Sequence, residues 1–191
     1  GLNFAWKELT DMILLFLADG FEETEALVPV DLLRRTKCEI KTVGVGKKEI
    51  TGSHGISVIA DITTEELASY SDSVEMVILP GGMPGTLNLE ASKEVKKTVL
   101  DAFQNGNFIA AICAAPSVLG HWNLLKNQTA VCYPGYEKDL GCKIGSESVV
   151  CSGQFITAKG AGVALDFSFQ LIEALCGSKK ALDVKKSIQC R

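Results

Sequence analysis

An apolar run stands at residues 108–116 and reads Phe-Ile-Ala-Ala-Ile-Cys-Ala-Ala-Pro. The five residues before the cysteine follow Asn-Gly-Asn and are too few for a helix, so they predict a buried strand. Pro116 fits the first turn of a helix, where its missing N–H costs nothing. Cys113 is therefore expected in a sharp strand-to-helix turn, the geometry of a nucleophile elbow.

This turn suggests two interpretations of Cys113. The amides and the macrodipole at the start of the following helix favour a thiolate, so the turn predicts a lowered pKa for Cys113. The alternative is a small core cysteine, because free cysteine is among the most buried residues. The run alone leaves both open.

The composition suits one α/β domain of a cytoplasmic protein. The 191 residues are 47% hydrophobic and 22% charged, and the formal net charge is -4. This balance argues against nucleic-acid and membrane partners, and we expect no membrane span or signal peptide. The seven cysteines include no C-x-x-C pair and there are only two histidines. We therefore expect reduced thiols and no metal site.

Strands and helices alternate along the chain, which predicts a mostly parallel sheet with helices on both faces. Residues 1–11 are interpreted as a tag remnant or leader and residues 12–191 as a single domain. The expected strands are 12–18, 39–45, 76–79, 108–112 and 129–133, with hairpins at 47–60 and 148–157. Helices are expected over 64–70, 92–105 and 164–175. A further helix is expected to end at Arg35, and another to begin at Pro116. In the helix over 92–105, Phe103 is expected to face inwards.

Three turns should meet at one edge of this sheet, because each follows the carboxyl end of a strand. Ligands of such folds bind at this edge. The three turns are Asp19-Gly20, Pro80-Gly81-Gly82 and the turn at Cys113. Gly-Gly after a strand is often an ordinary turn. In this position the Gly82 N–H could instead pair with the Ala114 N–H as an oxyanion hole.

Three acidic residues open the first long helix. For Glu22 and Glu23, complementing the helix dipole is a sufficient explanation. Glu25 differs, because Pro29 cannot donate to its carbonyl and a proline inside a helix marks a kink. A protonated Glu25 near Cys113 could stabilise a thiolate or serve as a general base.

The motifs together are identified as those of a known superfamily. They are Asp19-Gly20-Phe21-Glu22-Glu23-Thr24-Glu25 with Pro29-Val30-Asp31, then Leu79-Pro80-Gly81-Gly82, then residues 110–116, then Lys159-Gly160-Ala161-Gly162. In this order they resemble the DJ-1/ThiJ/PfpI superfamily (class I glutamine amidotransferase-like) from Met12 to Gly177. The branch that holds the Parkinson's-disease protein and bacterial YajL is the most similar.

The resemblance implies a flavodoxin-like (Rossmann-like) three-layer sandwich that forms a homodimer. It implies that Cys113 is the reactive, oxidisable cysteine and that Glu25 is a protonated glutamate in contact with it. Gly82 and Ala114 match the backbone donors of the site. Activities assigned in the family are glutathione-independent glyoxalase, deglycation of methylglyoxal adducts, chaperone activity and redox sensing. No cofactor is implied.

The sequence departs from the family at several positions. Tyr133 stands where a histidine is often found, and Lys159 replaces an arginine; with Gly160 both are expected to line the site. His54 and Arg35 match the dimer region. His121 lies eight residues beyond Cys113, about 12 Å along a helix, so we expect it at a helix end or on the surface.

We expect a cysteine-dependent glyoxalase or deglycase that acts on methylglyoxal-like dicarbonyls or their protein adducts in oxidative and carbonyl stress. The substrate would be the small dicarbonyl or a glycated protein. The alternative is a non-enzymatic redox sensor or redox-regulated chaperone that works through oxidation of Cys113. A structural cysteine in a binding module is a third interpretation. Peptidase activity is not expected, because no histidine is available as a general base for Cys113.

Overall fold

The computed structural model describes residues 11–70 and 74–191. The interpretation of residues 1–11 as a tag or leader therefore falls, apart from Asp11, outside the described residues. Within the described part, no helix has both the length and the apolar character that crossing a membrane requires.

The core of the molecule is a seven-stranded sheet in the order β10-β11-β7-β6-β1-β2-β5. Its strands run parallel except β10, which is antiparallel to β11. The bounds are β1 Met12–Leu17, β2 Glu39–Gly44, β5 Ile62–Thr63, β6 Val74–Leu79, β7 Phe108–Ile112, β10 Val149–Ser152 and β11 Phe155–Ala158. The expected mostly parallel α/β sheet is confirmed.

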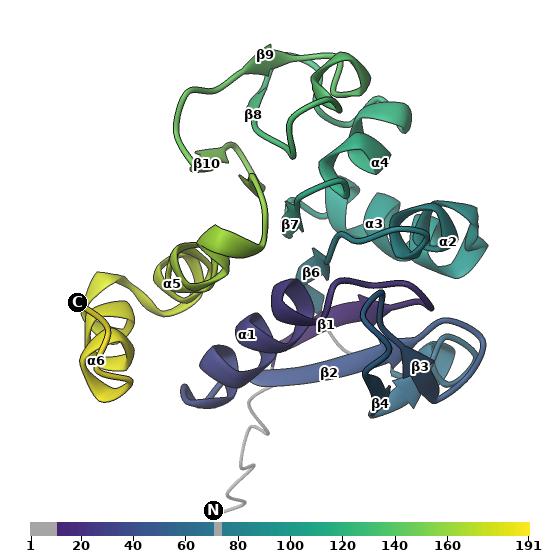
Figure 1. Cartoon of the computed structure of the whole chain (residues 1–191), viewed down its shortest axis with the longest axis horizontal. Helices are drawn as coiled ribbons and strands as arrows, with labels where there is room; N and C mark the ends of the chain where they lie inside the picture. Colours follow the sequence, from purple (N-terminus) through teal and green to yellow (C-terminus); the bar gives the residue numbers. More distant parts are fainter. Residues whose placement is uncertain (1–10, 71–73) are drawn as a thin grey trace, which may run out of the picture.

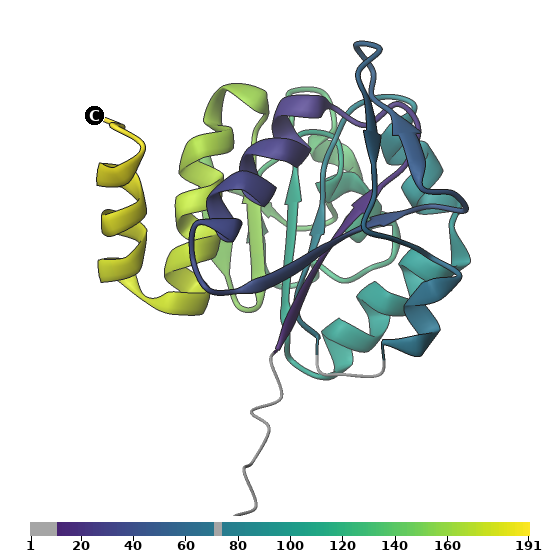
Figure 2. The same cartoon turned by 90° about the horizontal axis from the view of Figure 1, so that it is seen from below.

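Helices cover both faces of the sheet and make three layers (Figures 1 and 2). Alternate residues of β1 enter two separate cores, because successive strand side chains point to opposite faces. One core is closed by α1 (Glu23–Arg34), α5 (Ala164–Cys176) and α6 (Ser178–Ser187). The other is closed mainly by α2 (Gly85–Ala91), α3 (Lys93–Gln104) and α4 (Pro116–His121). The three-layer sandwich is thus confirmed.

Short elements lie outside the main sheet. The hairpin of β3 (Glu49–Thr51) and β4 (Ser57–Ile59) is antiparallel, as expected for residues 47–60. β8 (Thr129–Ala130) pairs with β9 (Lys143–Ile144) in a sheet of its own. Three 3-10 helices, η1 (Glu66–Ser69), η2 (Glu137–Asp139) and η3 (Ala161–Val163), complete the described part of the chain.

The structure corrects several expected elements. The strand expected over 129–133 is only β8, and the helix expected over 64–70 is the 3-10 turn η1. α2 and α6 were not anticipated. Phe103 does not face inwards: it is 38% exposed near the end of α3, with its ring centroid 6.1 Å from that of Phe155. Helical periodicity predicted an inward side chain there, but the last turn of α3 leaves the ring half exposed.

Candidate functional site

Cys113 occupies the turn between β7 and α4. Its φ of +67° lies in the left-handed region, which costs a non-glycine residue on the order of 1–3 kcal/mol. Hydrogen bonds on both sides hold this conformation: the Cys113 N–H donates to the Ala158 carbonyl at 2.9 Å, and the Tyr133 N–H donates to the Cys113 carbonyl at 2.8 Å. The sharp strand-to-helix turn expected from the sequence is present, and Cys113 is half buried in it.

The turn after β6 passes directly against this elbow. A Cβ added to Gly81 would lie 2.6 Å from the Cys113 Cβ and 2.6 Å from Oε1 of Glu25, so only glycine fits there. The Glu22 N–H donates to the Gly81 carbonyl at 2.9 Å, which ties this turn to the start of α1. Gly82 follows with φ of +93°. The turns after β1, β6 and β7 therefore meet at one edge, as expected.

Sequence reasoning singled out Gly82 and missed Gly81. The Pro-Gly-Gly motif was a signal for both glycines. It did not reveal which glycine contacts the cysteine, because that depends on the register between β6 and β7, in which Leu79 lies opposite Ala111.

Glu25 lies in the first turn of α1 and is 1% exposed. Neither carboxyl oxygen has a hydrogen-bond partner of normal geometry among the described residues. Burial raises the pKa of Glu25 to about 7, which outweighs the lowering effect of Cys113 and the Gly81 N–H. An unpartnered buried carboxylate is costly, so the group holds its proton up to near-neutral pH.

The pKa of Cys113 contradicts the expectation from the turn. Burial, followed by the neighbouring Glu25 carboxylate, raises it to about 12 instead of lowering it. The N–H groups of Ala114 and Gly82 are close enough to act in the opposite direction, but they are outweighed. The local prediction was wrong because α4 begins only at Pro116 and has six residues, while burial and Glu25 act directly on the sulfur.

Cys113 and Glu25 therefore form a pair that resists a double negative charge. The Glu25 carboxylate raises the pKa of Cys113, whereas the Cys113 thiol lowers that of Glu25, so the carboxyl group loses its proton first and the thiol keeps its own. Near neutral pH the pair keeps at least one proton. Passing that proton from the thiol to the carboxyl would leave a thiolate beside a neutral acid and two N–H donors.

Glu22 and Glu23 have separate structural roles. Glu22 caps α1, its Oε2 accepting the Glu25 N–H at 2.8 Å. Glu23 is buried, and its carboxylate accepts the His54 N–H at 2.9 Å and the Ile56 N–H at 3.3 Å. Complementing the helix dipole was therefore an incomplete account of Glu23, which holds the loop of the β3–β4 hairpin. Burial acts to raise the pKa of Glu23, but the His54 ring and these N–H donors outweigh it and lower it.

The structure also brings together three groups that could ligate a cation. Glu22, Glu23 and His54 each offer one ligand atom, and these atoms lie within 4.8 Å of one another. The Glu23 oxygens already accept backbone N–H donors and the Nδ1 of His54 lies 3.0 Å from Oε1. Glu23 and His54 are thus already held by contacts within the protein, and Glu22 caps α1.

The structure partly tests the expected site-lining residues. Tyr133 is hydrogen-bonded to Cys113 through its backbone and is half exposed. A Cβ on Gly160 would lie 3.5 Å from Cδ2 of Tyr133, so these two residues are neighbours. Lys159 follows β11, and its N–H donates to the Ser148 carbonyl. A role for these three residues toward a substrate remains a prediction.

The two histidines and Arg35 form their side-chain contacts with carboxylates other than Glu25. His121 ends α4 and bridges Oε1 of Glu90 (2.6 Å) and Oδ1 of Asp139 (3.1 Å), as expected for a residue at a helix end. Hydrogen bonding to Asp139, then to Glu90, raises its pKa. Arg35 is exposed and pairs with Asp31 on its own helix at 3.1 Å. The assignment of Arg35 and His54 to a dimer region stays a prediction.

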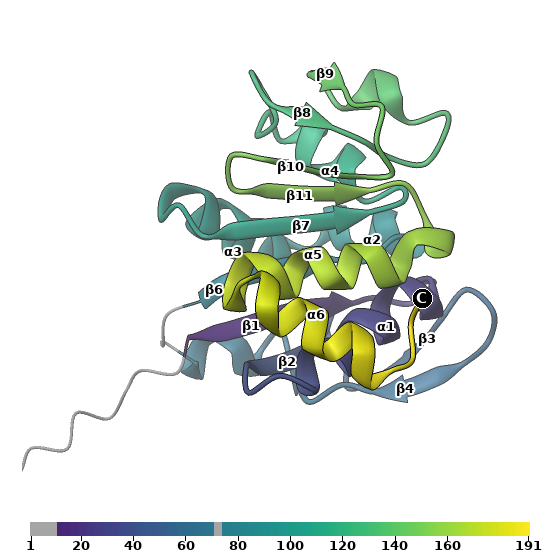
Figure 3. The same cartoon turned by 90° about the vertical axis from the view of Figure 1, so that its left-hand side faces the viewer.

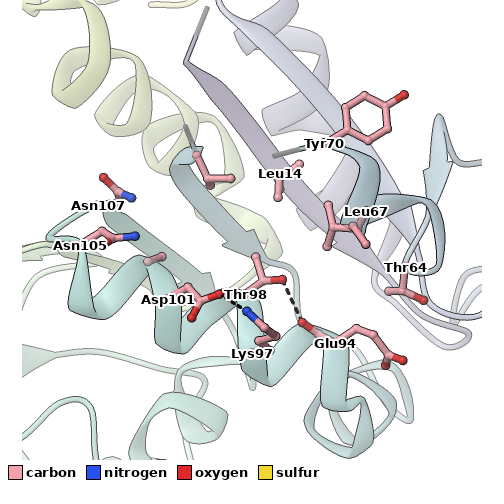
Figure 4. A pocket seen from close by; sticks show the side chains of 13 residues that line it. Leu14, Thr64, Leu67, Tyr70, Glu94, Lys97, Thr98, Asp101, Asn105 and Asn107 are labelled. Atoms are coloured by element: carbon pink, nitrogen blue, oxygen red, sulfur yellow. Dashed lines mark hydrogen bonds and ion pairs between the residues drawn. The ribbon is translucent and has the colours of Figure 1, made fainter. Parts of the chain in front are cut away.

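A roomy cavity lies elsewhere in the molecule. Its volume is about 720 Å³, and it is lined by Leu14, by Leu67 and Tyr70 beside η1, and by Lys97 and Asp101 on α3 (Figure 4). Leu14 of β1 reaches it from the face of the sheet that carries α3. Cys113 and Glu25 are not among its lining residues, so the cysteine site is a separate feature.

Comparison with known proteins gives one consistent result. The model of the DJ-1/PfpI family matches residues 11–174. Protein DJ-1 homolog B of Arabidopsis thaliana is 36% identical over 95% of this chain. Glutathione-independent glyoxalase DJR-1.2 of Caenorhabditis elegans is 26% identical over 92% of this chain and 94% of its own length. The chain spans less than half the length of the Arabidopsis relatives that it matches.

Solved structures agree with this result. The crystal structure of Drosophila melanogaster DJ-1beta superposes with a TM-score of 0.90 at 29% identity and covers 95% of this chain and 99% of its own. The matched family model extends over all seven strands of the main sheet and over the Cys113 elbow. The chain therefore belongs to the DJ-1/PfpI family.

Proposed function

We propose that this protein is a cysteine-dependent, glutathione-independent glyoxalase or deglycase that acts on methylglyoxal-like dicarbonyls or their protein adducts. The observation that carries the proposal is the pairing of Cys113 with the buried carboxyl group of Glu25, with the N–H groups of Gly82 and Ala114 beside the sulfur. A relative named as a glutathione-independent glyoxalase supports the same chemistry.

In the first step, the Cys113 sulfur attacks the aldehyde carbon of the dicarbonyl. The thiol proton passes to the Glu25 carboxylate as the C–S bond forms, so the pair never carries two negative charges. The aldehyde oxygen becomes an oxyanion, which the Gly82 and Ala114 N–H groups would stabilise. Glu25 then returns its proton to this oxygen, which gives a neutral hemithioacetal.

In the second step, the Glu25 carboxylate removes the hydrogen from the carbon bonded to sulfur. Returning that proton to the neighbouring carbon, while the hydroxyl proton moves from the oxygen of the sulfur-bearing carbon to the oxygen of that neighbouring carbon, converts the hemithioacetal into a thioester. Water then cleaves the thioester and releases lactate, and Cys113 recovers its proton. A carboxyl group with a pKa near 7 suits both directions of transfer, because efficient acid–base groups titrate near the working pH.

The decisive experiment measures methylglyoxal consumption and D- and L-lactate formation. We expect lactate from the wild type and none from Cys113→Ser. Cys151→Ser is the matched control, because Cys151 is an exposed thiol on β10. If fully reduced wild-type protein forms no lactate, or if Cys113→Ser forms as much as the wild type, the enzyme proposal is wrong.

A second candidate is a redox sensor that works through oxidation of Cys113. Two peroxide molecules would convert the thiol into a sulfinic acid with release of two waters. The protonated Glu25 and the N–H groups of Gly82 and Ala114 would stabilise a sulfinate as they would an oxyanion. Tyr133 at the position where the family often has histidine favours this candidate, because no histidine assists the enzymatic steps.

Peroxide titration followed by mass spectrometry tests the sensor. We expect Glu25→Gln to change the oxidation of Cys113 far more than Glu22→Gln does, because only Glu25 lies against the sulfur. Equal effects of the two substitutions would remove Glu25 from the sensor. Lactate formation by the reduced protein distinguishes the enzyme from a sensor without enzymatic activity.

A further inference from the structure

Two cysteines that play no part in the proposed chemistry meet on the other side of the molecule. The Sγ atoms of Cys38 and Cys176 lie 3.2 Å apart, although the residues are 138 positions apart in the sequence. Both thiols are free and half buried. Cys38 stands between α1 and β2, and Cys176 is the last residue of α5. The contact therefore joins two elements that are remote in the chain.

The surrounding structure holds both backbones in place. α1 and α5 are packed side by side on one face of the sheet (Figure 3). The Cys38 N–H donates to Oγ1 of the buried Thr36 at 3.1 Å, and the Thr36 hydroxyl donates to the Leu33 carbonyl. Gly177 turns the chain after Cys176 with φ of +87°. The two thiols are thus positioned by a helix pair and two fixed turns.

This pair is distinct from the Cys113 site. Cys38 lies just before β2, at the amino end of that strand, and the first residue of β2 pairs with the first residue of β1. Cys113 lies just after β7, at the carboxyl end of that strand. In a parallel sheet these positions lie at opposite edges. A change at Cys38 and Cys176 can therefore be followed separately from the chemistry of Cys113.

We propose that Cys38 and Cys176 are a redox-sensitive pair that closes to an intramolecular disulfide by exchange with a small disulfide such as glutathione disulfide. One thiolate attacks the small disulfide, forms a mixed disulfide and releases one glutathione thiol. The second cysteine then attacks the protein sulfur of the mixed disulfide and releases the second glutathione thiol. The protein loses two hydrogens, and one glutathione disulfide is reduced to two thiols.

The geometry favours the second step. A disulfide bond is about 2.05 Å long, so the sulfurs need to approach by only about 1.1 Å. Side-chain rotation can supply this movement, because both sulfurs already touch. Burial, and then Cys38, raise the pKa of Cys176 to about 12. Since the thiolate is the attacking species, closure is expected to be slow near neutral pH and faster in alkali.

Closure would also change the stability of the chain. A bond between residues so far apart restricts the unfolded chain strongly, so it is expected to raise the Tm by on the order of 10 °C. The bond would tie the end of α5, and α6 packed on it, to the turn after α1.

The test incubates the purified protein with glutathione disulfide, blocks the remaining thiols and maps peptides without reduction. We expect a peptide that links Cys38 to Cys176 in the wild type and in Cys151→Ser, together with a raised Tm that dithiothreitol reverses. Cys38→Ser and Cys176→Ser should each abolish both signals. If either variant folds poorly, the peptide map of the wild type and its Tm with and without dithiothreitol still decide the matter.

The proposal is overturned if, in alkali and after the exposed Cys151 has reacted completely, Cys38 and Cys176 remain reduced or carry glutathione separately. It is also overturned if the linked peptide forms but glutathione disulfide raises the Tm of the wild type no more than it raises the Tm of the two serine variants. Lactate formation is measured in the same samples. Its absence would contradict the enzymatic role of Cys113 and would leave the proposed disulfide between Cys38 and Cys176 standing.

Discussion

Replacing Glu25 by glutamine should make the stability of the protein less sensitive to pH. The carboxyl group has a pKa of about 7 in the folded protein against 4.5 as an ordinary glutamate, because burial disfavours its charged form. An acid whose pKa is raised by folding binds its proton more tightly in the folded state. Its contribution is therefore complete below pH 4.5 and is lost as the pH rises through about 7.

The size of the effect follows from this difference in pKa. A shift from 4.5 to about 7 corresponds to about 3 kcal/mol, at 1.36 kcal/mol for each pH unit. Glu25→Gln places a neutral side chain of the same shape in the site and cannot lose a proton there. The variant should therefore gain about 3 kcal/mol relative to the wild type between about pH 4 and about pH 8.

The measurement is urea unfolding of the wild type and Glu25→Gln at several pH values in this range. The difference between the two free energies of unfolding isolates Glu25, because the other titrating groups are common to both proteins. Glu22→Gln is the matched control: it removes a charge one turn away and keeps an oxygen that can accept the Glu25 N–H. The control should retain most of the pH dependence of the wild type, because burial is the largest cause of the raised pKa of Glu25 and the charge of Glu22 is a smaller one.

A difference that stays constant from about pH 4 to about pH 8 would refute the reasoning, because it would give Glu25 the same pKa in both states. A difference that grows in the opposite direction would mean that the carboxylate is stabilised in the fold. Either result would also remove the basis for a proton shared between Glu25 and Cys113.

Three further predictions concern the same region. Gly81→Ala should abolish methylglyoxal turnover, because its Cβ would lie 2.6 Å from the Cys113 Cβ. The control Gly162→Ala should keep this turnover, because its Cβ meets nothing within 4 Å. Equal activities of the two variants would contradict the close packing at Gly81. Glu25→Gln should lower the pKa of Cys113 measured by alkylation against pH, because the carboxylate raises it, and an unchanged profile would separate the two groups. Glu23→Ala should cost roughly 2 kcal/mol and speed hydrogen exchange in the β3–β4 loop, because it leaves two backbone N–H donors without an acceptor; unchanged exchange would contradict this role.

The elbow at Cys113 could be predicted because its signals are local. An apolar run of five residues and a proline at the first helical position define a strand, a turn and a helix with no information from the rest of the chain. The parallel sheet follows from the alternation of elements, and the meeting of three turns follows from the parallel sheet. Each of these steps needs only the order of the residues.

The pKa of Cys113 could not be obtained in this way. The sequence shows a cysteine before a helix, and the helix dipole is a local effect that lowers the pKa. Burial and the carboxylate of Glu25, which lies far away in the sequence, are non-local and stronger. Glu23 gives a similar lesson, because its N–H donors come from a hairpin about thirty residues further along the chain.

The two least favourable features of the site lie next to each other. Cys113 adopts a left-handed conformation that disfavours a side chain, and Glu25 is a buried carboxyl group whose oxygens accept no hydrogen bond of normal geometry from the part of the chain that the structure describes. Each lowers the stability of the fold, and both are held in place by a sheet in which β1 is buried along its whole length and β6 and β7 are buried toward the site. Local departures of this kind persist where the surrounding structure enforces them, and they concentrate at functional sites. Glu25→Gln should therefore stabilise the protein and at the same time lower its methylglyoxal turnover. Replacing a purely structural carboxyl group would not give both effects.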